Sequence, residues 1–292
     1  VLATGGYVSV PPVLAARLRR VPILIHEQTV QVGLANRIAA RCATRIALTF
    51  EEAVNDLPPR LRPKAFVTGN PVRDVIFTGD KSRAPARFGF AEADAALPTL
   101  YVTGGAQGAQ SINRIVESIL PQLLTLCRMI HQCGRQPEGQ MQDEARLTAL
   151  AQTLPPSLRA RYSVTGFVRD EIGDVFALAD LVIGRSGAGT VAEVCALGKP
   201  ALFIPLVPTG GDEQTRNARR LADAGAAKIL PSAALTGPAL LAEIQALLSD
   251  PDGLQAMGRS ALALARPNAA RDLAQAILAL AKVREMNPPP GP

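Results

Sequence analysis

The sequence has few aromatic residues and no tryptophan. Three Tyr and eight Phe make up 4% of its 292 residues, and no RNP-like or zinc-finger pattern is present. Proteins that recognise nucleic acid by base stacking or by base-reading modules depend on such residues and patterns. The sequence therefore argues against a nucleic-acid partner.

Long apolar runs are also missing. Charged residues interrupt every apolar stretch before it reaches the length of about 20 residues that spans a bilayer. The chain opens with Val-Leu-Ala-Thr, without a basic n-region or an apolar h-region, so we expect neither a membrane span nor a signal peptide. The hydrophobic fraction of 48% is still enough for buried cores in one large or two ordinary domains.

Cysteine is scarce and scattered. The four cysteines, Cys42, Cys127, Cys133 and Cys195, form no CxxC pair. We interpret them as small core residues of a protein in a reducing cytoplasm.

The charge balance is basic, with 31 Lys and Arg against 25 Asp and Glu and a net charge of +6. The densest basic cluster is Arg17, Arg19 and Arg20, at the end of the helical stretch 13–20. A solvated helix face is the ordinary explanation. Contact with anionic lipid or with a polyanionic substrate is the alternative.

Short apolar runs alternate with helix-like stretches along nearly the whole chain. This alternation is typical of βαβ units and parallel sheets, and it predicts an α/β fold. The predicted strands are 22–26, 45–49, 65–68, 99–103, 129–132, 162–165, 181–183, 201–204 and 227–230. The predicted helices include 34–43, 109–126, 171–179, 191–197 and 214–224.

The segment 75–98 interrupts the alternation, because it is charged, contains Gly and Pro and has no clear period. We interpret it as a linker between a Rossmann-like N-terminal domain, 1–74, and a second such domain, 99–286, whose last helix could return to the first. A doubly wound domain usually needs on the order of 100 residues. The first domain is therefore expected to be incomplete, with an N-terminal segment missing. The Pro-rich tail 287–292 is expected to be disordered.

The most informative motif joins a predicted strand to a helix through small residues. The apolar run 181–183 leads into Gly184-Arg185-Ser186-Gly187-Ala188-Gly189-Thr190, and an amphipathic stretch follows. Backbone N–H groups and the positive end of a helix dipole meet in such a turn, which suits a phosphate. Glu193 follows within reach of a sugar hydroxyl. The alternative is a turn that only lets the helix pack closely on the sheet.

Five further segments are polar or rich in glycine. Three could each have a structural or a site role: a glycine turn at 4–11, His26-Glu27-Gln28-Thr29, and 68–73 with Arg73. His26 could carry a proton or simply be a hydrogen-bonded structural histidine. The fourth, 103–109, resembles a dinucleotide fingerprint only loosely and lacks the acidic residue that would accompany NAD. Near it, His131 is interpreted as structural. A fifth segment, Asp212 to Ala218, opens a helix and suits sugar hydroxyls, although Asp212 could be only an N-cap.

Seven motifs occur here in the order seen in the MurG family, and their combination identifies the chain as a member of it. They are GGYVS-P, HEQ, GNPVR, GGxQGA with Ala106 at x, HQxG, RSGAGT-x-x-E and DEQTxNA, and the resemblance extends from Leu2 to about Leu230. It implies a GT-B architecture, with two Rossmann-like domains facing a cleft. It also implies inverting transfer of GlcNAc from UDP-GlcNAc to the 4-hydroxyl of MurNAc in lipid I.

The resemblance implies a role for each site residue. Backbone groups near Val168 receive the uracil, Ser186, Gly187, Ala188, Gly189 and Thr190 the diphosphate, Glu193 the ribose and Gln214 the GlcNAc. Arg73 and Ala106 also belong to the donor site, while Tyr7, His26, Glu27 and Thr29 line the acceptor side. It further implies peptidoglycan synthesis, serving cell shape and division, at the cytoplasmic face of the membrane. The enzyme would be peripheral there, on the anionic inner leaflet. No DxD-like acidic pair is placed to hold a metal, so no metal or cofactor is expected.

The sequence departs from the family at three places. Thr29 replaces the usual Asn after HEQ, and Ala106 replaces Ser in GGSQGA, each at an expected loss of about 1 kcal/mol of polar contact. The family's first glycine loop, GGTGGH, is absent, and its His is the favoured catalytic base. A non-catalytic UDP-sugar-binding fragment therefore remains an alternative. Another GT-B lipid glycosyltransferase, such as a diacylglycerol galactosyltransferase, and a UDP-GlcNAc 2-epimerase also remain open.

Overall fold

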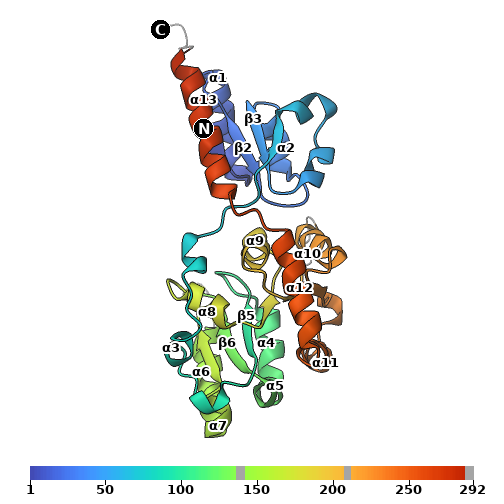
Figure 1. Ribbon diagram of the computed structural model, residues 1–292. Helices are drawn as coiled ribbons and strands as arrows, with labels where there is room; N and C mark the ends of the chain where they lie inside the picture. Colours follow the sequence, from blue (N-terminus) through green and yellow to red (C-terminus); the bar gives the residue numbers. More distant parts are fainter. Residues whose placement is uncertain (136–141, 207–211, 287–292) are drawn as a thin grey trace. The chain divides into compact units, whose positions relative to one another are not determined.

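The computed structural model describes residues 1–135, 142–206 and 212–286, and the chain forms two compact units (Figure 1). Unit 1 comprises Val1–Val72 and the C-terminal segment from Arg266, and unit 2 comprises Arg73–Ala265. The predicted disordered tail, 287–292, lies outside the described residues. None of the described helices is long and apolar enough to cross a membrane.

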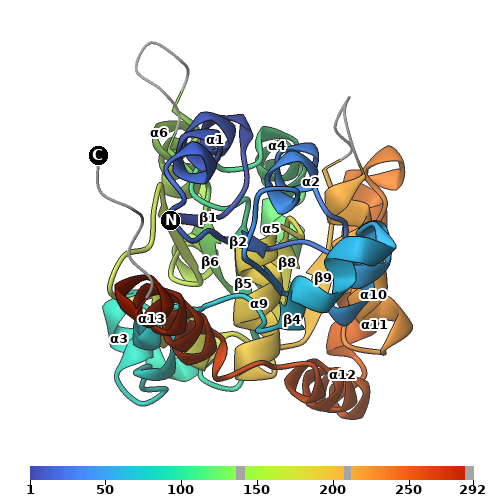
Figure 2. The same cartoon turned by 90° about the horizontal axis from the view of Figure 1, so that it is seen from above.

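Unit 1 contains a four-stranded parallel sheet in the order β1-β2-β3-β4. Its strands are β1 (Leu2–Ala3), β2 (Leu24–Glu27), β3 (Arg45–Leu48) and β4 (Ala65–Val67), and its first helices are α1 (Val10–Leu18) and α2 (Leu34–Ala40). The three strands after β1 match the predictions to within two residues at either end. Helices α1 and α2 contact each other (Figure 2).

The sheet of unit 1 is covered on both faces. Ile25, Ile46 and Leu48 belong to a core that includes Val13 of α1 and Ala39 of α2. The alternate strand residues, Leu24 and Ala47, pack instead with Leu273 of α13 (Ala269–Met286). Because successive strand residues point to opposite faces, α13 must cover the face away from α1 and α2. The last helix thus belongs to unit 1. The sequence allows for this return of the last helix to the first domain.

Unit 2 contains a six-stranded parallel sheet in the order β10-β9-β8-β5-β6-β7. Its strands are β5 (Thr99–Thr103), β6 (Arg128–Gln132), β7 (Tyr162–Thr165), β8 (Leu181–Gly184), β9 (Ala201–Phe203) and β10 (Lys228–Ile229). Strands β5, β6 and β8 are buried along their whole length, as expected for parallel strands covered on both faces. Strand β6 nevertheless carries three buried polar or charged residues, Arg128, His131 and Gln132. The predicted α/β, doubly wound architecture is confirmed in this unit.

Helices cover the sheet of unit 2 on both sides. They are α4 (Gln110–Ser118), α5 (Leu120–Leu126), α6 (Asp143–Thr153), α7 (Pro156–Arg159), α8 (Ile172–Leu178), α9 (Ala188–Leu197), α10 (Glu213–Asp223), α11 (Gly237–Leu248) and α12 (Pro251–Ala263). The stretch 109–126, predicted as one helix, is two. The backbone leaves the helical conformation at Ile119, and Pro121, which lacks an N–H, is accommodated in the first turn of α5.

The segment 75–98, expected as a linker, is a folded part of unit 2. It contains α3 (Ala84–Arg87), and the segment packs on α8. Asp174 of α8 is 2% exposed and accepts hydrogen bonds from Asp80 N (2.9 Å), Arg83 Nη2 (3.2 Å) and Arg87 Nη1 (2.8 Å). The charges that suggested a solvated linker instead bind it to one buried carboxylate.

The cysteines are free thiols, as expected from their scatter. Cys127, Cys133 and Cys195 are buried, and Cys42 is half-buried. Burial raises the pKa of the Cys127 and Cys133 thiols to about 12 and that of Cys195 to about 11. At neutral pH these three thiols are protonated and behave as small apolar residues.

Candidate functional site

The sheet of unit 2 reverses its strand order between β5 and β8. From β5 the chain proceeds outward through β6 and β7, and it then returns to the other side of β5 with β8. In doubly wound sheets the crevice at the carboxyl ends of such strands is where ligands bind. The two loops that leave these ends are 104–109 and 185–187, both selected from the sequence.

The loop after β8 leaves the first turn of α9 open. Gly187 is the N-cap residue and offers no side chain to the orphan N–H groups of Ala188, Gly189 and Thr190. A Cβ added at Gly187 or at Gly189 would meet nothing within 4 Å. By contrast, a Cβ at Gly184 would collide with the carbonyl oxygen of Thr103. Close strand packing explains Gly184, and open space for a ligand is left at the other two.

The loop after β5 is held by a crossing of backbones. Gly108 has φ +76° and Gly134 has φ +89°, and a Cβ on either would collide with backbone beside the other. Arg135 N donates to Ala106 O at 3.0 Å, which fixes the tip. Ala106 itself is exposed. These contacts account for the last glycine of GGxQGA, Gly108, and for the glycine of HQxG, Gly134.

Gln132 joins the loop after β5 to the segment at Val168. The sequence alone did not select it as a site residue. Its Nε2 donates to Gly105 O (3.0 Å) and Thr103 Oγ1 (3.2 Å), while its Oε1 accepts from Val168 N (3.0 Å). The Val168 side chain is buried, and its N–H is therefore occupied. At Val168 this leaves the carbonyl, rather than the N–H, for a ligand. The HQxG motif was the available signal.

Arg185 is directed away from the open turn. Its guanidinium donates to Ile204 O (2.8 Å), Ser232 Oγ (3.1 Å) and Ser111 Oγ (2.8 Å). Burial lowers its pKa. The arginine of RSGAGT therefore ties the loop to β9 and α4.

Glu193 stands one turn further along α9 and is paired with Arg73. Arg73 Nη2 lies 3.4 Å from Glu193 Oε1, with the side chains 52% and 20% exposed, respectively. Burial raises the pKa of Glu193, and the charge and hydrogen bond of Arg73 offset part of that rise. The two charged residues chosen from separate motifs thus meet within unit 2.

Helix α10 supports the turn through one backbone carbonyl and one side-chain amide. Ser186 Oγ donates to Gln214 O (2.7 Å), and Asn217 Nδ2 donates to Ser186 O (3.1 Å). The Gln214 side-chain oxygen accepts from Leu206 N at 2.9 Å. Ser186 and Gln214 are thereby brought together, with the serine hydroxyl already used in holding the loop.

The four residues expected on the acceptor side lie in unit 1, and three of them are buried. His26 Nε2 lies 3.0 Å from Gly69 O and 3.2 Å from Thr49 Oγ1. Burial lowers its pKa. Tyr7, in contrast, is 87% exposed. Of the two roles that the sequence left open for His26, this environment favours the structural one.

Glu27 organises the loop that follows β2. Its Oε1 accepts from Thr29 N (3.1 Å) and Thr29 Oγ1 (2.9 Å), and its Oε2 accepts from Gly33 N (2.9 Å) and Asn36 Nδ2 (2.9 Å). Thr29 Oγ1 lies also 2.8 Å from Gln31 O. The Thr29 hydroxyl thus makes its polar contacts within the loop. The expected effect of this residue on substrate contact stays a prediction.

His131 is buried in a polar network, in line with its interpretation as structural. Nδ1 lies 2.9 Å from Tyr162 Oη, and Nε2 lies 3.0 Å from Asn113 Oδ1. Burial lowers its pKa to about 3, so the ring is neutral. Within the described ranges, no group of three or more His, Cys, Asp and Glu residues could hold a metal ion.

Comparison with known proteins defines the class. Residues 99–277 match the C-terminal domain of glycosyltransferase family 28, and residues 1–48 match the N-terminal domain of that family. More particularly, the chain belongs to the family of UDP-N-acetylglucosamine–N-acetylmuramyl-(pentapeptide) pyrophosphoryl-undecaprenol N-acetylglucosamine transferases. The member from Nocardioides sp. is 38% identical over 283 residues, covering 96% of this chain and 72% of the relative. That from Mycolicibacterium paratuberculosis is 39% identical, covering 98% and 67%.

Solved structures agree with this assignment. The crystal structure of Acinetobacter baumannii MurG is similar with a TM-score of 0.71 and 32% identity, covering 95% of this chain and 74% of that one. The GT-B architecture is thereby confirmed. A UDP-GlcNAc 2-epimerase from Neisseria meningitidis bound to UDP-GlcNAc has a TM-score of 0.66 at 16% identity, covering 95% and 75%. That likeness shows a shared fold only.

Proposed function

We propose that unit 2 binds UDP-GlcNAc at the carboxyl edge of β5 and β8, and that the chain transfers its GlcNAc to lipid I, yielding lipid II. The observation that carries the proposal is the open first turn of α9, one turn from Glu193, at the strand switch point. Family membership supports the substrates, because they are those in the relatives' names. The alternative that the chain is a UDP-GlcNAc 2-epimerase is supported only by a shared fold.

The donor would lie with its diphosphate on the N–H groups of Ala188, Gly189 and Thr190. Its ribose hydroxyls would donate to Glu193, its uracil would meet the backbone at Val168, and its GlcNAc would lie near Gln214. The departing UDP gains negative charge as the glycosidic bond breaks, and preorganised N–H groups at a helix N-terminus stabilise such charge. This arrangement needs no metal ion to neutralise the leaving group.

The acceptor 4-hydroxyl would attack the anomeric carbon from the face opposite UDP, which inverts its configuration. A general base must take the hydroxyl proton during this attack. His26 is ill suited, since it is buried, hydrogen-bonded and has a lowered pKa. The described residues thus assign no base, and donor binding is the better supported half of the proposal.

Unit 1 offers a surface suited to a lipid-linked acceptor. Tyr7, Val8, Leu14 and Leu18 are exposed on η1 (Tyr7–Ser9) and α1, as is Leu34 at the start of α2. The basic residues Arg17, Arg19 and Arg20 end or follow α1. Exposed apolar side chains next to arginines favour peripheral contact with an anionic leaflet. This supports, as a proposal, a location on the cytoplasmic face of the membrane.

The test of transfer is an assay with radiolabelled UDP-GlcNAc and a lipid I analogue in anionic vesicles. Labelled lipid II is the expected product. Saturable donor binding without transfer would instead favour the non-catalytic UDP-sugar-binding alternative. For the membrane contact, replacing Arg17, Arg19 and Arg20 by Gln should reduce cosedimentation with anionic vesicles, and unchanged cosedimentation would contradict it.

A further inference from the structure

A cavity lies at the edge of the unit 2 sheet where its strands begin. It has a volume of about 790 Å³, within the range of small-molecule sites. Pro98, Arg128, Asp180 and Pro200, which line it, directly precede or begin strands β5, β6, β8 and β9. The candidate donor site is at the carboxyl ends of β5 and β8, so this cavity is a separate feature.

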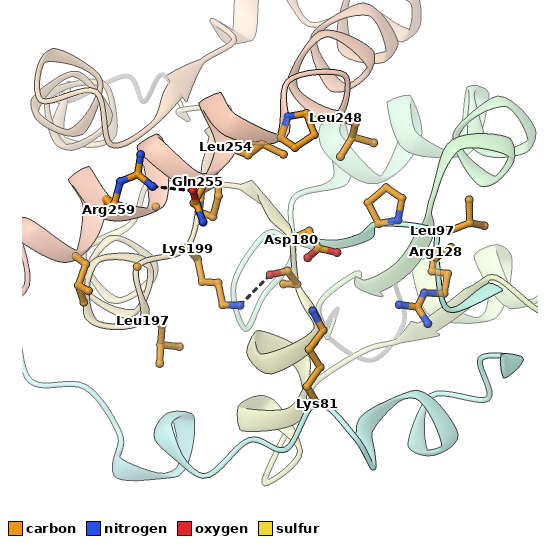
Figure 3. Close-up of a pocket in the computed structure, with 18 of the residues that line it drawn as sticks. Lys81, Leu97, Arg128, Asp180, Leu197, Lys199, Leu248, Leu254, Gln255 and Arg259 are labelled. Atoms are coloured by element: carbon orange, nitrogen blue, oxygen red, sulfur yellow. Dashed lines mark hydrogen bonds between the residues drawn. The ribbon is translucent and has the colours of Figure 1, made fainter. Parts of the chain in front are cut away.

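The cavity is basic. Lys81, Arg128, Lys199 and Arg259 line it against one carboxylate, Asp180, so its lining carries four positive charges and one negative charge (Figure 3). Asp180 Oδ2 is engaged, because it accepts from Thr99 N at 2.8 Å. Burial lowers the pKa of Lys199, the charge of Asp180 offsets part of that effect, and the charge of Lys81 adds to it. Lys199 Nζ donates to Ala179 O at 2.9 Å. An anion would relieve this crowding of cations.

Arg128 is the decisive residue. It is only 4% exposed, yet its Nε has no hydrogen-bond partner, and its guanidinium makes no ion pair among the described residues. Its contact is the face of Phe90, with Cζ 5.3 Å from the ring centroid. A mostly buried guanidinium without a protein hydrogen bond or ion pair is costly, and native proteins normally provide a counter-ion. Here that partner would have to come from the cavity.

The remaining walls are aliphatic. Leucines from four segments line the space: Leu97, Leu197, Leu248, Leu254 and Leu262. Leu262 is 55% exposed although it belongs to this wall. A ligand that matched both the basic residues and the aliphatic wall would need a negatively charged head and an apolar body.

We propose that this cavity is a second binding site, for a small amphiphilic anion whose phosphate or carboxylate head pairs with Arg128 and whose aliphatic part lies along the leucines. The ligand does not compete with UDP-GlcNAc. Leu197, the last residue of α9, and the following residues Gly198 to Pro200 line the site, and α9 connects them to the turn at Gly187.

The test is calorimetric titration of the whole chain with dodecyl phosphate below its micelle concentration, with butyl phosphate and with dodecanol. Dodecyl phosphate should bind saturably, with saturating UDP present or absent. Binding of butyl phosphate as tight as that of dodecyl phosphate would support a soluble organic phosphate as ligand, and a much tighter dodecyl phosphate would support a lipid. No saturable binding of either phosphate, or equal binding of dodecanol, would overturn the proposal.

Two variants make the test specific. Arg128→Met should weaken dodecyl phosphate binding about tenfold or more, because a charged hydrogen bond is lost. It should also raise the melting temperature of the ligand-free chain, because an unpaired buried charge is removed. Arg159→Gln, at an exposed position on α7, is the matched control and should change neither. A fully folded Arg128→Met with unchanged affinity would contradict the assignment.

Discussion

Arg73 Nη2 lies 3.4 Å from Glu193 Oε1, and this contact joins the residue that begins unit 2 to the middle of α9. Glu193 is largely buried, and its charge would otherwise be poorly solvated. Arg73 therefore offsets part of the rise that burial causes in the pKa of Glu193, a carboxylate that stands one turn from the open N–H groups. An ionised carboxylate accepts hydrogen bonds from ribose hydroxyls more strongly than a neutral one does.

Glu193→Gln should weaken UDP binding about tenfold, because a charge-assisted hydrogen bond to ribose becomes a neutral one. Calorimetric titration with UDP measures the change. Glu243→Gln is the control, since it removes the same charge from a pair with Lys228 on β10 and α11. Equal affinity of the two variants would argue against the ribose contact.

The same residue predicts a pH dependence of stability. Its pKa is raised in the folded chain above the ordinary 4.5, so the folded state holds the proton more tightly than the unfolded state. Stability from this group is present below pH 4.5 and is lost as pH rises through the folded pKa. Glu193→Gln should therefore melt at a higher temperature than the parent at pH 7, and the difference should shrink towards pH 4. A constant difference would contradict this.

A pair of glycine substitutions separates ligand contact from packing. Gly189→Ala places its Cβ in open space at the start of α9, so stability should be unchanged or higher by about 0.5–1 kcal/mol. UDP affinity should nevertheless fall, because the methyl group occupies the space proposed for diphosphate. Gly184→Ala should lower stability by about 1–3 kcal/mol through overpacking on Thr103. Urea unfolding and UDP titration of both variants check this; unchanged UDP affinity in Gly189→Ala would be the contrary result.

Asp174→Asn should loosen the segment 75–98 from α8. Three donors converge on this buried carboxylate, and the loss of its charge should cost about 2 kcal/mol, a figure that allows for the half-exposed arginines. Limited trypsin digestion should then cut faster after Arg83 and Arg87. Asp252→Asn, at an exposed position on α12, is the control. Equal cutting in both would show that the carboxylate does not hold the segment.

Sequence patterns predicted most strands because buried parallel strands are rich in apolar and β-branched residues, as in 100–102 and 181–183. They also located the loops of the strand switch point, since glycine is required where backbones cross. These patterns did not predict the folded state of 75–98. A charged segment has the same sequence pattern whether its side chains face water or bind a buried carboxylate such as Asp174. The patterns failed again within 109–126, where a helical period continues across the break before Pro121.

The sequence indicated the positions of the candidate site but not the contacts that its residues make. Arg73 and Glu193 are 120 residues apart, and their pairing depends on the tertiary fold. Polar side chains that seemed free in the sequence, such as Glu27 and Gln132, are occupied in holding loops. Residue type and spacing cannot distinguish a polar group that supports a loop from one that meets a ligand.

Calorimetric titration of the chain with UDP-GlcNAc, with UDP-glucose as the comparison, tests the central claim most directly. The account predicts saturable binding with a stoichiometry of about one, tighter for UDP-GlcNAc and weakened by Glu193→Gln and Gly189→Ala but not by Arg128→Met. Absence of UDP-GlcNAc binding in a folded chain, or binding indifferent to Glu193 and Gly189, would contradict the donor site at the β5 and β8 edge.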